Sequence, residues 1–135
     1  MRFTTAMLAD QAQVTAGKLF VLGGGFDTLT TRSVPAVHRS IAVVLVAEIG
    51  PADRNRDLEV TIRLVDEDGG ETGVEANGKF RVGAPSSLPA GATSSVPLVT
   101  MFNNLRFEKQ GGYVFAVEHE GAELARIPLR VRALQ

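Results

Sequence analysis

The sequence predicts a single all-β domain, and three observations support this prediction. Apolar residues alternate with polar ones at a period of two in several separate segments. Turn-forming residues fall between those segments at short intervals. No segment repeats apolar residues at the spacing that a helix of about ten residues would need. Together these features are typical of an antiparallel β-sandwich, which we expect to span residues 1–135 as one domain.

Four segments show the alternation most clearly, and each predicts a strand with one face on the core. Polar residues between the apolar ones would face the other way. The apolar members of the four rows are Leu58, Val60, Ile62 and Leu64; Val74, Ala76, Phe80 and Val82; Tyr113, Phe115 and Val117; and Ile127, Leu129 and Val131.

The N-terminal part of the chain predicts a β-hairpin. The short runs 12–14 and 18–22 are separated by the turn residues Thr15, Ala16 and Gly17. Gly23, Gly24 and Gly25 follow, which could suggest a phosphate-binding loop. Such a loop needs a lysine and a serine or threonine at the start of a helix, and neither feature is present. We therefore expect these glycines to supply a bulge or a positive φ.

The run 41–47 differs from the other strands because it is apolar on both faces, from Ile41 to Ala47. Such a strand needs cover on both sides. We expect the opposite sheet to cover one face, and either the N-terminal hairpin or a partner chain to cover the other. A long loop is expected at residues 83–95, which are rich in Gly, Pro, Ala and Ser.

Composition excludes several classes of function. The chain of 135 residues has no cysteine, so disulfides, thiolate metal sites and cysteine nucleophiles are absent. A formal net charge of −1, from 14 basic and 15 acidic residues, creates no long-range field for nucleic acid or anionic lipid. No apolar run approaches the roughly 20 residues that span a bilayer, and no signal peptide is apparent. We expect a cytoplasmic protein with no nucleic-acid or membrane partner.

The acidic turn at residues 66–71, from Asp66 to Glu71, is the best candidate for a cation site. It fails the EF-hand pattern because Gly70, Glu71 and Asn77 occupy positions that need other residues. A solvated hairpin turn is the simpler interpretation. A small-molecule or calcium-binding domain that uses this turn and the loop 83–95 stays an alternative hypothesis.

Catalytic residues are not apparent in the sequence. His38 and His119 are far apart, and neither has a second histidine or cysteine at ligand spacing. We expect His119 at the end of a strand, near the surface. No Gly-x-Ser-x-Gly elbow supports a serine–histidine–acid set, so a hydrolase is the least favoured alternative. The sequence predicts no catalytic, cofactor-binding or metal-ligating residue and no cofactor.

Basic residues form a stripe near the C-terminus. Arg126, Arg130 and Arg132 share one face of a predicted strand, and Arg106 and Lys109 could join them. A surface that binds nucleic acid usually adds overall basicity or exposed stacking aromatics, which this chain lacks. We therefore expect a solvated face paired with nearby acids.

Two stretches of the N-terminal region resemble a known family. The block from Leu8 to Asp10 and the block from Gly17 to Asp27 are similar to the start of a family of small bacterial proteins of unknown function, common in actinobacteria. Later segments, around Pro97, Tyr113 and Pro128, are similar to the same family. This resemblance implies no activity and no catalytic residues.

The C-terminal third also resembles the last hairpin of immunoglobulin-like sandwiches. In that architecture a tyrosine near the start of a strand binds a loop through its hydroxyl, and Tyr113 has the matching position. The resemblance implies an immunoglobulin-like fold with an added N-terminal hairpin. For function we predict a non-enzymatic binding or assembly module that acts through protein–protein contacts or self-association.

Overall fold

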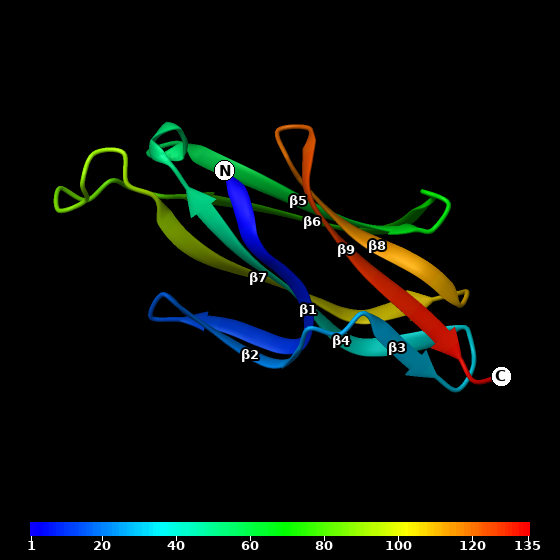
Figure 1. Cartoon of the computed structure of the whole chain (residues 1–135). Helices are drawn as coiled ribbons and strands as arrows, with labels where there is room; N and C mark the ends of the chain where they lie inside the picture. Colours follow the sequence, from blue (N-terminus) through cyan, green and yellow to red (C-terminus); the bar gives the residue numbers. More distant parts are fainter.

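Nine strands form two packed sheets in the computed structural model, which describes residues 1–135 (Figure 1). Sheet A has the order β2-β1-β4-β7, and sheet B has the order β3-β9-β8-β5-β6. A single 3-10 turn at Pro51–Asp53 follows β4. No helix of the protein is long and apolar enough to cross a membrane. The strands are β1 (Arg2–Thr15), β2 (Lys18–Gly24), β3 (Thr28–Thr31), β4 (Ala36–Ile49), β5 (Asp57–Asp66), β6 (Glu71–Arg81), β7 (Ser94–Phe107), β8 (Gly111–His119) and β9 (Ala122–Ala133).

The core lies between the two sheets and is built from the predicted apolar rows. β5, β8 and β9 contribute alternate residues that are almost fully buried, and aromatic rings join the sheets across the core. The ring centroids of Phe102 and Phe115 are 5.5 Å apart, and those of Phe107 and Tyr113 are 5.1 Å apart. Strand alternation in these rows is therefore confirmed. The row on β6 is only partly buried, because β6 is an edge strand that pairs with β5 alone.

One pair of strands corrects the prediction of a purely antiparallel sandwich. β3 runs parallel to β9, with Thr28 opposite Arg130 and Thr31 opposite Ala133. The backbone amide of Arg130 also donates to the carbonyl of Asp27 at 2.7 Å. The chain leaves β2, crosses to the other sheet and joins it at the C-terminal strand, so the first and last parts of the chain close one side of the fold.

β4 is covered on both faces, as the sequence predicts. Ile41, Val43 and Leu45 point into the core between the sheets, while Ala42 and Val44 are fully buried on the outer face of sheet A. The cover on that outer face comes from the N-terminal hairpin of the same chain. A partner chain is not required to bury residues 41–47.

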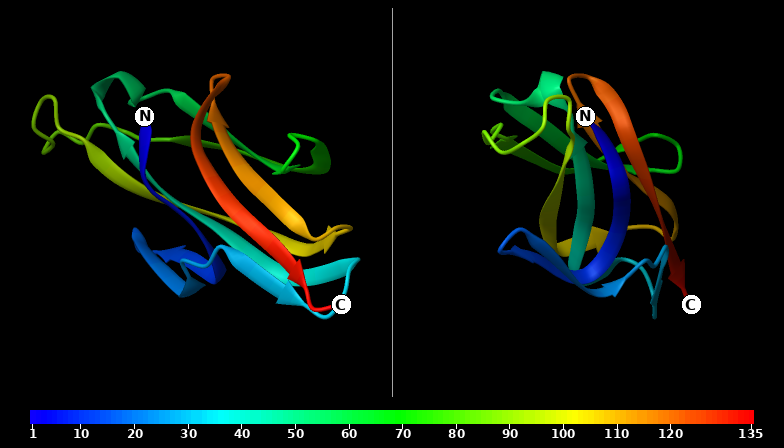
Figure 2. Two further views of the ribbon diagram at one scale, coloured as in Figure 1. Left: turned by 45° about the vertical axis from the view of Figure 1, so that its right-hand side comes forward. Right: turned by 60° about the vertical axis from the view of Figure 1, so that its left-hand side comes forward.

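The curl of β1 explains how the hairpin reaches that face. β1 pairs with β4 from Arg2 to Ala9, and then pairs with β2 from Ala9 to Thr15. Where its partner changes from β4 to β2, the strand bends, and its second half turns across sheet A (Figure 2). Ala12 and Leu19 of the hairpin then pack against the cluster of Ala42 and Val44.

The expected long loop is present between β6 and β7. Arg54 holds it by donating to the carbonyl oxygens of Gly83 at 2.8 Å and Ala92 at 3.2 Å, and to the Ser94 hydroxyl at 2.8 Å. The loop lies at the far left of Figure 1, and the acidic turn between β5 and β6 lies at the upper right. The two segments are therefore at opposite ends of β6.

Candidate functional site

The β1–β2 hairpin forms because two residues between the strands adopt positive φ. Ala16 has φ 50° and Gly17 has φ 73°, while Thr15 and Lys18 pair directly across the turn. Positive φ at both central positions is typical of the tight turns that join antiparallel strands. The predicted hairpin is confirmed at these residues.

The glycine run ends the hairpin by a backbone mechanism. Gly23 and Gly25 have φ of 66° and 88°, and the amide of Gly25 donates to the carbonyl of Leu8 at 2.8 Å. At Gly24 a side chain would meet the Cγ1 atom of Val21 at 2.7 Å. The prediction that these glycines shape the chain is confirmed for the two with positive φ.

Four exposed apolar side chains gather on this hairpin. We call Val14, Phe20, Val21 and Leu22 the hairpin patch, and their exposed fractions are 42%, 53%, 37% and 71%. They account for four of the six large apolar side chains that the protein exposes. The other two, Val37 and Leu134, lie on or beyond different strands, so the exposed apolar side chains are concentrated on the hairpin.

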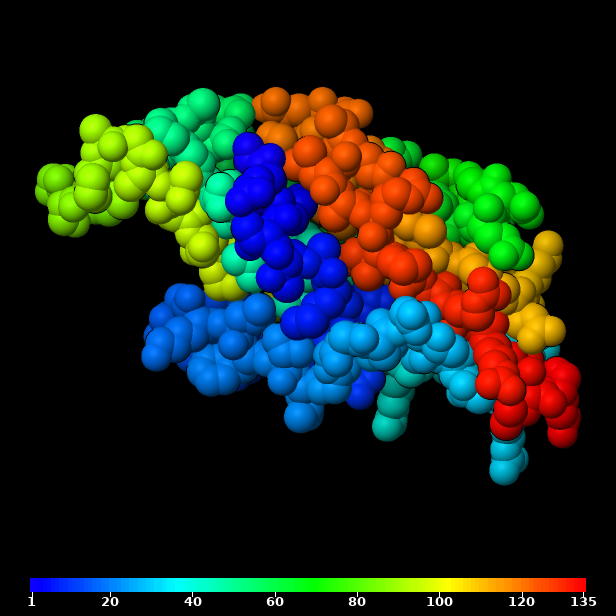
Figure 3. Space-filling view, viewed as in Figure 1, coloured from blue at the N-terminus to red at the C-terminus, as the bar shows by residue number.

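Three residues of the hairpin patch, Phe20, Val21 and Leu22, line a shallow hollow that has no charged side chain in its wall. The hollow has a volume of about 220 Å³ and is bounded by Gln11, Gln13, Phe20 and Leu22, with Ala12 and Val21 between them. Because Leu19 packs inward, strand alternation places Phe20 and Leu22 on the opposite face of β2. In Figure 3 the hairpin stands at the lower left margin, separated by a recess from the loop between β6 and β7.

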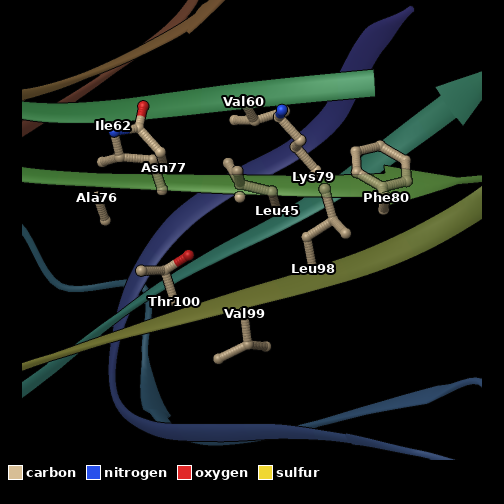
Figure 4. Close-up of a pocket in the computed structure, with 11 residues that line it drawn as sticks. Leu45, Val60, Ile62, Ala76, Asn77, Lys79, Phe80, Leu98, Val99 and Thr100 are labelled. Atoms are coloured by element: carbon tan, nitrogen blue, oxygen red, sulfur yellow. The ribbon is translucent and has the colours of Figure 1, made fainter. Parts of the chain in front are cut away.

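A second hollow lies where the two sheets separate, between β6 and β7. It has a volume of about 170 Å³, and Figure 4 shows Leu45 between Val60 and Leu98, with Phe80 to one side. Asn77, Lys79 and Thr100 supply its polar margin. The volume is close to that of an engineered cavity that holds benzene, so it has no room for a peptide strand.

The acidic turn lines a larger polar groove at one end of the molecule. The groove has a volume of about 660 Å³, and only three of its 15 lining residues are hydrophobic. Two of its carboxylates are engaged with the backbone, and one of them, Asp66, accepts from the amides of Asp68 at 2.9 Å and Gly70 at 2.7 Å. Glu67 accepts from the amide of Gly112 at 3.2 Å.

No group of three or more ligating side chains is placed to hold a metal ion. The small-molecule or calcium alternative named the acidic turn and the loop 83–95. The structure separates these two segments by the length of β6, so a single site cannot include both. Ligand pockets are mostly apolar with a few placed polar groups, which the polar groove is not.

The histidines do not form part of any groove described above. His119 lies at the end of β8, as predicted, but it is buried with 9% exposure instead of lying near the surface. Its Nδ1 atom lies 2.9 Å from the carbonyl oxygen of Glu59, and its Nε2 atom lies 3.6 Å from Oε1 of Glu120. His38 is on β4 and lies opposite Leu105 of β7, whereas His119 is on β8 of the other sheet, so the structure does not bring the two imidazoles together.

A charge network surrounds the 3-10 turn, close to His119. Asp53 is buried and accepts from the Met1 ammonium and from Arg56, at 2.7 and 2.8 Å. The hydrogen bond from Met1 lowers the pKa of Asp53 most, burial opposes this shift, and the bond from Arg56 reinforces it. Arg56 also binds Glu120 at 2.7 Å. All these groups have partners, which is typical of a structural network.

The basic stripe is only partly paired. Arg126 donates to Glu123 at 2.9 Å and Arg106 donates to Glu108 at 2.6 Å, as the sequence predicts. Arg130 and Arg132 form no ion pair and project from β9 into solvent. No exposed aromatic side chain accompanies them, because the one exposed ring is Phe20 on the hairpin.

Sequence reasoning located the hairpin but missed its exposed surface. Leu19, Phe20, Val21 and Leu22 form a continuous apolar run at the edge of the sheet. The available signal was that this run, like residues 41–47, is apolar on both faces. Only the topology shows that β2 has a partner on one side alone.

The fold and these surfaces define a class of protein: an all-β module of two packed sheets, with a hairpin folded over the outer face of one sheet. The chain belongs to a family of unknown function, DUF6941, whose family model matches residues 4–132. The resemblance to a family of unknown function is thereby confirmed. A comparison with curated proteins finds no match.

Solved structures offer distant likenesses. An alkylpurine DNA glycosylase, AlkC, of Pseudomonas fluorescens bound to DNA containing an abasic site analog is 18% identical, with a TM-score of 0.48. The similarity covers 98% of this chain and 30% of that chain. A β-glucuronidase from glycoside hydrolase family 2 is 16% identical with a TM-score of 0.34, covering 73% of this chain and 11% of the other. The chain thus spans less than a third of either protein, and these likenesses carry no argument about function.

Proposed function

We propose that this chain is a non-enzymatic binding or assembly module, and that the hairpin patch is its contact surface for another protein. The observation that carries the proposal is the concentration of exposed apolar side chains, Phe20 and Leu22 above all, on an edge strand. Aromatic and large apolar residues dominate the energetics of protein interfaces. The cytoplasm is the proposed compartment, supported by the absence of cysteine.

The strand order is consistent with a widespread sandwich fold to which the β1–β2 hairpin has been added. We propose that this fold is immunoglobulin-like. The neighbours β5-β8-β9 and β1-β4-β7 follow the order that strands C, F and G, and strands A, B and E, have in that fold. Tyr113 at the start of β8 donates its hydroxyl to the carbonyl of Lys109 at 2.7 Å, as in a tyrosine corner. β2 then lies outside these six strands, as do β3 and β6.

Binding assays with matched variants test the proposed function. We would immobilise the wild type, the double variant Phe20→Ser/Leu22→Ser, and the control Val37→Ser, which removes an exposed apolar residue from β4. Each would be offered native lysate and a separately tagged copy of the chain, and captured proteins would be re-tested in purified form. The proposal expects a protein that the wild type and Val37→Ser retain and the double variant loses. If all three variants capture the same proteins equally, the hairpin patch is not the contact surface.

A further inference from the structure

The four free sheet edges of the molecule are not equally protected. β6 carries Glu71, Glu75, Lys79 and Arg81 along its exposed positions. β7 contains Pro97, and β3 is only four residues long. Charges, proline and short length are the usual devices that stop an edge from pairing with another chain. β2 has none of them beyond Lys18 at its first position.

We propose that the partner of the hairpin patch is a second copy of this chain, with the two β2 strands paired antiparallel about a two-fold axis at Val21. This inference rests on the proposed function, because it uses the same surface. The pairing joins the two A sheets into one continuous sheet of eight strands, four from each copy. A two-fold contact is closed, so it yields a dimer and no longer assembly.

The apolar side chains of β2 are self-complementary in this arrangement. Val21 is the midpoint of Lys18–Gly24, so an axis there places Phe20 of each copy opposite Leu22 of the other. Directly opposed side chains on one face of an antiparallel pair lie about 5 Å apart. The two most exposed residues of the hairpin therefore cover each other, once on each side of the axis.

Charge at the two ends of β2 favours the antiparallel direction. Lys18 begins the strand, and the carboxylate of Asp10 lies directly over Gly23 near the other end, where a Cβ would collide with it. Neither side chain has an ion-pair partner within the chain. Antiparallel pairing about Val21 sets Lys18 of each copy opposite Gly24 of the other copy, one residue from the position that Asp10 overlies. Parallel pairing would set like charges side by side.

The position of the hairpin and the overall charge allow such a contact. Both views in Figure 2 place the hairpin at the margin of the molecule, as Figure 1 does. The net charge of −1 creates little repulsion between two copies. Because only a seven-residue strand and one patch take part, we expect a dimer whose population depends on concentration.

Sedimentation velocity from about 1 µM to about 1 mM tests the inference on the wild type, Leu22→Lys and the control Val37→Lys. We expect a monomer–dimer equilibrium for the wild type and the control. Leu22→Lys should raise the dissociation constant at least about tenfold, because it puts a charge on the edge strand. Circular dichroism and thermal unfolding would confirm that each variant is folded.

A charge swap tests the direction of pairing. Lys18→Asp and Asp10→Lys should each weaken the dimer, and the double variant should restore it. A strict monomer at every concentration would overturn the inference, and so would a dimer that Leu22→Lys leaves unchanged. If the wild type stays monomeric but still captures a different protein through Phe20 and Leu22, the inference fails while the proposed function stands.

Discussion

Two continuous apolar runs of this protein differ in how far the fold buries them. Residues 41–47 on β4 are covered on one face by sheet B and on the other by the hairpin. Residues 19–22 on β2 turn Leu19 inward and leave Phe20 and Leu22 in solvent. The same pattern therefore means core in a central strand and exposed surface in an edge strand. The difference arises from the number of neighbours, which the fold decides and local composition does not.

The largest expected effect on stability concerns the buried run on β4. Leu45 is 1% exposed in the core, so Leu45→Ala should lower the free energy of unfolding by about 2–5 kcal/mol. Val37→Ala, on the exposed part of the same strand, should change it by less than about 0.5 kcal/mol. Urea unfolding measures both. Similar costs for the two variants would contradict the assignment of Leu45 to the core.

A close contact inside the hairpin provides the next test. Gly24→Ala would push a methyl group against Val21, which is stiff at χ1, and should cost about 1–3 kcal/mol. Val21→Ala removes that obstacle and should recover part of the loss. A double-mutant cycle by urea unfolding measures the coupling. Additive effects of the two changes would show that Gly24 is not limited by Val21.

On β2, truncating the smaller inward side chain should cost more stability than truncating the larger outward one. Leu19→Ala removes part of the cover over Ala42 and Val44, and we expect it to cost about 1–2 kcal/mol. Phe20→Ala removes a larger side chain that is 53% exposed, and should cost less than about 0.5 kcal/mol in the monomer. Thermal or urea unfolding at low protein concentration keeps the dimer out of the measurement. A larger loss for Phe20→Ala would mean that this ring is part of the core.

The smallest effect concerns the charge network remote from the hairpin. The pKa of Asp53 is lowered in the folded protein by the Met1 ammonium first, against the opposing effect of burial. Its contribution to stability is therefore present above the ordinary pKa of about 4 and is lost as the pH falls through the lower, folded-state value. Unfolding free energies measured from pH 7 down to about pH 3 should fall less steeply at the acid end for Asp53→Asn than for the wild type. Parallel curves would contradict this role.

Much of the fold follows from the sequence, because alternation and turn residues are local. The rows on β5, β8 and β9, the hairpin turn at Ala16 and Gly17, and the two-sided burial of β4 are all confirmed. The hydrogen bond from Tyr113 is confirmed as well. Each of these features is determined by residues close together in the sequence, or by a run of apolar residues that must be buried.

Other features depend on which strands become neighbours, and the sequence does not encode that locally. The parallel pairing of β3 with β9 joins residues from opposite ends of the chain, such as Thr28 and Arg130. The burial of His119 depends on a carbonyl group of β5. The exposure of Phe20 and Leu22 depends on β2 being at the edge of its sheet. Each of these was missed or mispredicted because its cause lies in topology.

Disulfide trapping tests the central claim about β2 most directly. The chain has no cysteine, so Val21→Cys would introduce the only thiol. At a two-fold axis the two Cα atoms lie about 4.5–5.5 Å apart, within the range that a disulfide bridges. Mild oxidation should convert Val21→Cys to a covalent dimer that disappears on reduction, while Val14→Cys, on the other strand of the hairpin, should stay largely monomeric. Equal trapping of the two variants, or none for Val21→Cys at concentrations where the wild type dimerises, would contradict the pairing of two β2 strands at Val21.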